Sequence, residues 1–133
     1  MQNYKFLEHT ADIMFEAYGN SYPEALENAA KAMFSVLGAA KCKKKALFKV
    51  SAENLEELTL FSLSELLTYM DIHGMVFSSI KVKYFDESSK TVQFEACGEK
   101  KAPKDSIKAV TYHQLAVQKA INGKWTIRVL LDV

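Results

Sequence analysis

Apolar residues that recur every three to four positions indicate two helices. The first helix is predicted to begin at Ser21, an N-cap residue with Glu24 three positions later, and to end at Gly38. Between these ends the apolar side chains keep the spacing of a helix with one buried face. The second stretch with this spacing covers residues 54–70. The pattern therefore predicts two amphipathic helices, each with one face that packs against other elements.

Alternation of apolar and polar residues predicts strands before, between and after these helices. The expected strands are residues 4–8, 13–19, 47–50, 75–85, 91–97, 107–119 and 125–133. The last two are joined through Asn122-Gly123, a dipeptide typical of a two-residue hairpin turn. Strands joined by short turns pair antiparallel. We therefore expect an α+β fold, a single domain over residues 1–133 in which mainly antiparallel sheet is covered on one side by the two helices.

Composition and charge exclude several classes of protein. The 133 residues are 49% hydrophobic and 25% charged, as in one globular domain. Lysine and arginine number 17 against 16 acidic residues, so the basic excess of a dedicated nucleic-acid binder is missing. The five glycines are scattered and form no phosphate-binding loop. The sequence contains neither a signal-peptide pattern nor an apolar run long enough to span a bilayer, so we expect a cytoplasmic protein without membrane contact.

The spacing of the cysteines and of the clustered lysines does not indicate a functional site. Cys42 and Cys97 are far apart and form no CxxC motif, so neither a zinc ribbon nor a redox motif is indicated. A reduced compartment is expected, with Cys97 as an inert core thiol. The basic segment from Lys41 to Lys45 is interpreted as a solvated loop, with RNA phosphates or an acidic partner as the alternative.

Two aspartates lie where predicted strands end. Asp12 stands in the joint between the first two strands, and Asp132 is the penultimate residue. Together with the terminal carboxylate of Val133 they would form three anionic groups, whose repulsion is relieved most simply by a hard divalent cation such as calcium or magnesium. Each aspartate also has a structural interpretation: Asp12 as a turn residue that caps local amides, and Asp132 as a solvated chain end.

The final hairpin predicts a neighbour for one of these aspartates. If the Asn122-Gly123 turn has two residues and no bulge follows, His113 lies opposite Asp132 on one face of the sheet. His113 would then belong to a polar pocket at the end of the sheet. Alternatively, it is a neutral histidine that is hydrogen-bonded to the neighbouring carboxylate.

Several motifs, in order along the whole chain, resemble the archease family. They are FLEHTAD at residues 6–12, SYPEALENAAKAMF at 21–34, SELLTYMD at 64–71, Gly98-Glu99, KAVTYH at 108–113 and VLLDV at 129–133. Two positions depart from the family's common pattern. Met14 stands where glycine is usual, and Gln114 stands where a small residue is usual.

The resemblance implies a small cytosolic accessory protein that is not itself an enzyme. Its partner would be the GTP-dependent tRNA-splicing RNA ligase of the RtcB type, and it would promote guanylylation of that ligase and multiple turnover in tRNA ligation. RNA would be contacted only indirectly. The resemblance also implies a bound metal, described as calcium, on Asp12, Asp132 and Val133. His9 and His113 would support these ligands or face the partner.

Two other functions compete with this interpretation. One is a small metal-dependent hydrolase that uses Asp12, His113 and Asp132. The other is a chaperone-like module that stabilises RNA-modifying enzymes. Catalysis by the isolated protein would favour the first, and protection of unrelated proteins from aggregation would favour the second.

Overall fold

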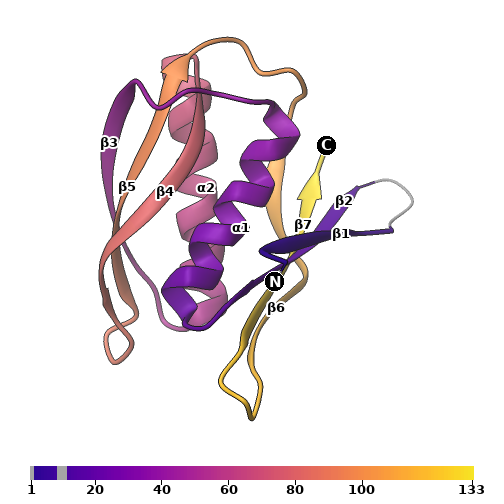
Figure 1. Ribbon diagram of the computed structural model, residues 1–133, viewed down its shortest axis with the longest axis vertical. Coiled ribbons are helices and arrows are strands. Elements are labelled where there is room, and N and C mark those ends of the chain that lie inside the picture. The colour runs from indigo at the N-terminus through magenta and orange to yellow at the C-terminus, as the bar shows by residue number, and fades with distance from the viewer. Residues whose placement is uncertain (1, 9–11) are drawn as a thin grey trace.

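Two helices lie between two antiparallel sheets (Figure 1). The computed structural model describes residues 2–8 and 12–133. In this part of the chain the elements are β1 Tyr4–Leu7, β2 Ile13–Gly19, α1 Tyr22–Leu37, β3 Lys44–Ser51, α2 Leu55–His73, β4 Met75–Asp86, β5 Thr91–Lys100, β6 Ala109–Lys119 and β7 Trp125–Asp132. The strands form a four-stranded sheet in the order β1-β2-β7-β6 and a three-stranded sheet in the order β3-β5-β4. The expected α+β fold is confirmed.

The helix ends follow from local capping. Ser21 Oγ accepts a hydrogen bond from the Glu24 N–H at 3.2 Å, and the Gly38 N–H donates to the Phe34 carbonyl at 3.1 Å. Helix α1 therefore begins and ends as predicted. Helix α2 has Asn54 as its N-cap, at the start of the predicted range 54–70, but it extends three residues beyond the expected end, to His73.

One hydrophobic core connects the two sheets through the helices. Phe15 on β2 and Val129 on β7 are fully buried on the side that faces α1. On the other sheet Phe77 and Phe94 are almost fully buried, and the ring of Phe77 contacts Phe34 of α1. Burial of such large apolar side chains is the main stabilising contribution to the fold. No helix in the described ranges is long and apolar enough to cross a membrane.

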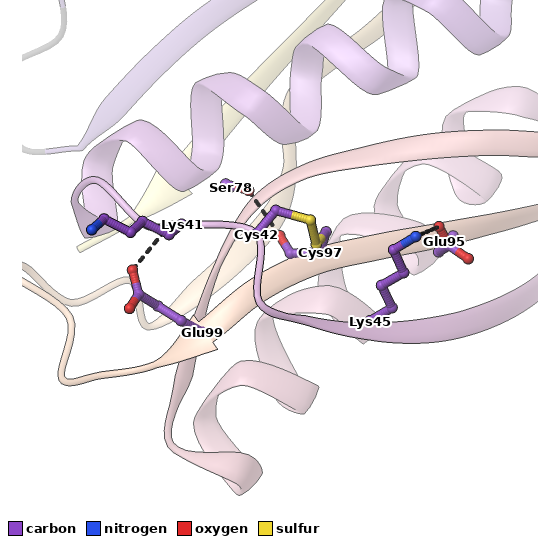
Figure 2. Close-up of a disulfide and its surroundings, with 7 residues drawn as sticks. All are labelled: Lys41, Cys42, Lys45, Ser78, Glu95, Cys97 and Glu99. Atoms are coloured by element: carbon purple, nitrogen blue, oxygen red, sulfur yellow. Dashed lines mark hydrogen bonds and ion pairs between the residues drawn. A yellow bond between two sulfur atoms is a disulfide. The ribbon is translucent and has the colours of Figure 1, made fainter.

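The two cysteines form a disulfide, which corrects the prediction that Cys97 is an inert thiol (Figure 2). Their Cα atoms are 5.0 Å apart although 55 positions separate them in the sequence. The pairing of β3 with β5 brings them together, because Lys45 pairs with Cys97 and Cys42 lies just before β3 begins. This pairing is a long-range contact that the spacing of the cysteines does not reveal. Strand β3 also includes Lys44 and Lys45, which were expected in a loop.

Gly98 on β5 is required by the close approach of β4. A Cβ atom at this position would lie 2.6 Å from the Cα of Phe77 and would also collide with the carbonyl oxygen of Val76. Both are backbone atoms of β4, so they cannot move aside as a flexible side chain could.

We therefore expect Gly98→Ala to lower the free energy of unfolding by about 1–3 kcal/mol, because the added methyl group forces the backbones of β4 and β5 apart. Urea denaturation followed by circular dichroism measures this change. Gly74→Asn is the matched control, because Gly74 has a left-handed φ of 60° that asparagine tolerates and no atom lies within 4 Å of the added Cβ. Equal stability of Gly98→Ala and the wild type would contradict the prediction.

Reduction of the disulfide should lower the free energy of unfolding by about 2–4 kcal/mol, because the bridge closes a long loop and restricts the unfolded chain. Thermal unfolding with and without a reductant measures the effect. In the double variant Cys42→Ser, Cys97→Ser the reductant should have no effect. An unchanged melting temperature on reduction of the wild type would show that the bridge does not contribute to stability.

Candidate functional site

The pairing of β2 with β7 brings the two predicted aspartates to the same end of the sheet. Ile13 pairs with Leu131, and the antiparallel register continued by one position sets Asp12 against Asp132. Cross-strand partners point to the same face of a sheet, with Cβ atoms about 5 Å apart. Here this face is the one turned away from the helices, because the alternate residues Phe15 and Val129 are buried on the helix side. The two aspartates are therefore neighbours on the outer face of the sheet.

Asp132 is held in place from its other side by β6. Ala109 is its partner across the β6–β7 ladder, and the Lys108 N–H donates a hydrogen bond to the Asp132 carbonyl at 2.7 Å. The side chains of Asp12 and Asp132 are both half-buried. Within residues 2–8 and 12–133, neither aspartate takes part in any of the three ion pairs. The site therefore contains two partly desolvated carboxyl groups with no cationic side chain paired to them in the described structure.

Met14 lies directly beside this pair. It is two positions from Asp12 on the same face of β2, it pairs with Leu130, and only 5% of its surface is exposed. The thioether side chain thus supplies an apolar neighbour to the carboxyl groups on the side where glycine would have left space.

His113 does not lie opposite Asp132, so that prediction is wrong. The turn centres on Ile121 and Asn122, and Gly123 follows in a left-handed conformation with a φ of 87°, which makes a three-residue loop instead of a two-residue one. Next to the turn, the observed β6–β7 register therefore already differs by one position from the predicted register. The Asn-Gly dipeptide is compatible with both turns, and the sequence could not distinguish them.

A large bulge in β6 moves His113 further from the expected position. Thr111 pairs with Leu130 and Ala116 with Arg128, so residues 112–115 of β6 stand against Val129 alone. Within the bulge Gln114 has a φ of 57°, a left-handed conformation that is uncommon for residues other than glycine. A glycine would adopt this conformation without steric cost.

The bulge displays an exposed polar group next to β7. The Thr111 hydroxyl donates to the Leu130 carbonyl at 3.2 Å and accepts from the His113 N–H at 3.3 Å. The side chains of His113 and Gln114 are exposed, with 3.5 Å between their Nε2 atoms. His113 is thus a surface residue on a fixed backbone, while His9 lies outside the described residues.

The side chains in the described part of the chain supply some, but not all, of the oxygen ligands that a hard cation needs. No group of three or more histidine, cysteine, aspartate or glutamate side chains capable of holding a metal occurs within the described ranges. Asp12 and Asp132 supply two carboxyl groups from opposed strand positions, and Val133 follows Asp132 directly. Carboxylate oxygens are the ligands that calcium and magnesium prefer.

A cavity that the sequence analysis missed opens near this end of the sheet. Its volume is about 410 Å³, and its lining includes Leu37 at the end of α1, Met70 near the end of α2, and Ile107 and Lys108 before β6. Lys108 is the residue whose N–H bonds to Asp132, so the cavity and the acidic pair share a segment of backbone. Apolar residues from three segments far apart in the sequence form the cavity, and no local pattern reveals it.

Comparison with known proteins agrees with this architecture. The model of the archease protein family matches residues 4–133. Protein archease from Pyrococcus furiosus is 36% identical over 142 residues, covering 100% of both chains. A solution structure of a protein from Methanobacterium thermoautotrophicum matches with a TM-score of 0.81 and 30% identity, again over 100% of both chains.

A more distant structure shares the fold alone. The crystal structure of an archease from Thermotoga maritima has a TM-score of 0.73 and 24% identity, and the match covers 97% of this chain and 96% of that one. Both solved structures thus have the arrangement of sheets and helices described above. On the family model and the full-length relative together, this chain belongs to the archease family.

Proposed function

We propose that this protein is an accessory factor of the GTP-dependent tRNA-splicing RNA ligase of the RtcB type. It would promote guanylylation of the ligase and so sustain multiple turnover in tRNA ligation, without being an enzyme itself. Membership of the archease family supports a role as a partner protein. The cytoplasm, where the ligase and its tRNA substrates would be met, is the proposed location, and RNA would be contacted only through the ligase.

The observation that carries the proposal is the β2–β7 register, which ends at the pair Ile13–Leu131 and, continued by one position, sets Asp12 opposite Asp132. Like charges at opposed positions of two strands destabilise a sheet, so such a pair has a cost unless something binds to it. Aspartates at opposed strand positions have Cβ atoms about 5 Å apart, so their carboxyl groups can turn toward a single cation with oxygen ligands at about 2.3–2.6 Å. We propose a divalent metal, calcium, held by Asp12, Asp132 and Val133, with His9 and His113 facing the partner.

The bound cation and the exposed His113 would both act on the ligase at the protein surface. The chain has no nucleotide-binding loop, so an effect on guanylylation has to come from groups that it presents to the ligase. The bound cation, when present, would offer positive charge where negative charge develops on a phosphoryl group. Asp12 and Asp132 would orient it, and the exposed His113 would contact the ligase beside it.

Asp12→Ala and Asp132→Ala should each reduce the stimulation of the ligase by about tenfold or more, since each removes an oxygen ligand at the contact surface. The measurement is multiple-turnover RNA ligation with a cognate ligase and GTP, without addition, with the wild type and with each variant. Glu65→Ala is the control, because Glu65 is an exposed carboxylate on α2, away from the strand ends.

The accessory role is contradicted if the wild type does not stimulate a ligase that is known to be active. Normal binding and normal stimulation of the ligase by Asp12→Ala would contradict the role of the acidic pair. Turnover of phosphoesters by the isolated protein would instead support a metal-dependent hydrolase. Protection of unrelated proteins from aggregation would support the chaperone-like alternative, in keeping with the description of the Thermotoga maritima protein as a possible chaperone.

Calcium at about 100 times its Kd should raise the free energy of unfolding by about 2.7 kcal/mol, because the ion binds only the folded state. Thermal unfolding over a calcium series measures the gain, with magnesium as a parallel series. The gain should vanish in the double variant Asp12→Asn, Asp132→Asn and weaken when one residue is appended after Val133. An equal gain in the double variant would place the cation elsewhere.

A further inference from the structure

We propose that the Cys42–Cys97 bridge is a reversible modification site for anionic low-molecular-weight thiols, the chemical class of glutathione and coenzyme A. Cys42 is the sulfur that is attacked and that carries the adduct, and Cys97 is the resolving thiol. The inference concerns the three-stranded sheet and is independent of the proposed ligase function.

The two sulfur atoms differ in access to solvent. Cys42 is exposed in the connection between α1 and β3, whereas only 7% of the surface of Cys97 is exposed, on the central strand β5. Thiol–disulfide exchange requires the incoming thiolate to approach one sulfur atom from the side away from the other. That approach is open at Cys42, while the surrounding sheet restricts it at Cys97. Attack on Cys42 is therefore favoured.

The charges around the bridge favour an anionic thiol. Four lysines, at positions 41, 43, 44 and 45, surround Cys42 in the sequence. Two of these ammonium groups have acidic partners, Lys43 with Glu99 at 3.6 Å and Lys45 with Glu95 at 3.5 Å (Figure 2). Four positive charges against two negative ones leave a local excess of positive charge, which attracts an anion and raises its local concentration.

The leaving group also forms on the same face of the sheet as Lys45, whose ammonium group is paired with Glu95. Lys45 is the direct partner of Cys97 across the β3–β5 ladder, so the two side chains lie on the same face of the sheet. A nearby ammonium group stabilises a thiolate and makes it a better leaving group. When an incoming thiolate attacks Cys42, the Cys97 thiolate is thus expelled next to Lys45.

The exchange balances with two equivalents of the thiol. The first thiolate forms a bond to Cys42 Sγ, the Cys42–Cys97 bond breaks, and Cys97 leaves with the electron pair and takes up a proton from water. The second thiolate attacks the outer sulfur of the adduct and releases Cys42 as a thiolate, which is also protonated. Overall the bridge is reduced to two thiols, and two molecules of the small thiol are oxidised to their disulfide.

Contacts other than the bridge keep Cys42 close to Cys97 after exchange. The Lys43 N–H donates to the Gly98 carbonyl at 2.9 Å, and the Lys41 N–H donates to Glu99 Oε2 at 2.6 Å. The hydrogen bond from Lys41 also lowers the pKa of the Glu99 carboxyl, because it stabilises the charged form of the acceptor. With the loop fixed in this way, Cys97 can attack the adduct on Cys42 and restore the bridge, which makes the modification reversible.

The test measures exchange at the bridge of the oxidised, folded protein. Glutathione and coenzyme A are the anionic probes, 2-mercaptoethanol is the neutral control, and all rates are compared per thiolate. Intact mass and peptide mapping identify the adduct. We expect it on the peptide that contains Cys42, with the double variant Lys43→Gln, Lys44→Gln slowing the anionic thiols about threefold and leaving 2-mercaptoethanol unchanged. The ratio of the two anionic rates shows which of them the site prefers.

Single-cysteine variants separate the roles of the two sulfurs. In Cys97→Ser the adduct from oxidised glutathione should accumulate on Cys42, because no resolving thiol remains. In Cys42→Ser the buried Cys97 should react at least tenfold more slowly. The proposal is overturned by an adduct mainly on Cys97, by equal rates per thiolate for anionic and neutral thiols, or by exchange that rises only as urea unfolds the protein.

Discussion

The antiparallel pairing of β2 with β7 is the contact on which the rest of the four-stranded sheet depends. It joins the beginning of the chain to its end over seven consecutive pairs, from Ile13–Leu131 to Gly19–Trp125. On the inner face this register buries Phe15 and Val129 against α1. On the outer face the same register opposes Asp12 and Asp132. A slip by one residue would expose the aromatic ring and bury the carboxyl groups, so packing of the core also fixes the geometry of the candidate site.

Features fixed by local chemistry could be read from the sequence, whereas features fixed by long-range pairing could not. The caps of α1 depend on residues three or four positions apart, and the structure confirms them. The position of His113 depends on the type of the hairpin turn and on the bulge at residues 112–115, which contains it. Asn122-Gly123 suits either turn, and nothing in the sequence marks the bulge except Gln114, where the family usually has a small residue.

The disulfide was missed for a related reason. Cys97 follows Phe94 and Ala96 on a largely buried strand, and composition alone made a core thiol the simpler interpretation. The alternation of the strand, however, puts Phe94 and Ala96 on the inner face and Cys97 on the outer face. Only the pairing of β3 with β5 shows that Cys42 reaches this outer face. Asp12 and Asp132, by contrast, were expected at one end of the sheet because Asp12 directly precedes a strand and Asp132 ends one, and alternation does locate strands.

The segment between β5 and β6 links the region of the disulfide to the region of Asp132. Residues 101–108 leave β5 near the disulfide, where the Lys101 Nζ donates to the Ala39 carbonyl at 2.7 Å. The Lys104 N–H then donates to the Leu37 carbonyl at 2.7 Å, and the Lys108 N–H donates to Asp132 at the same distance. Each of these bonds ties the segment to a different element, and the cavity lies beneath it. The backbone at Asp132 is therefore positioned by the same segment that packs against the loop carrying Cys42. Because these hydrogen bonds do not involve the sulfur atoms, the acidic pair can keep its geometry whether the bridge is oxidised or reduced.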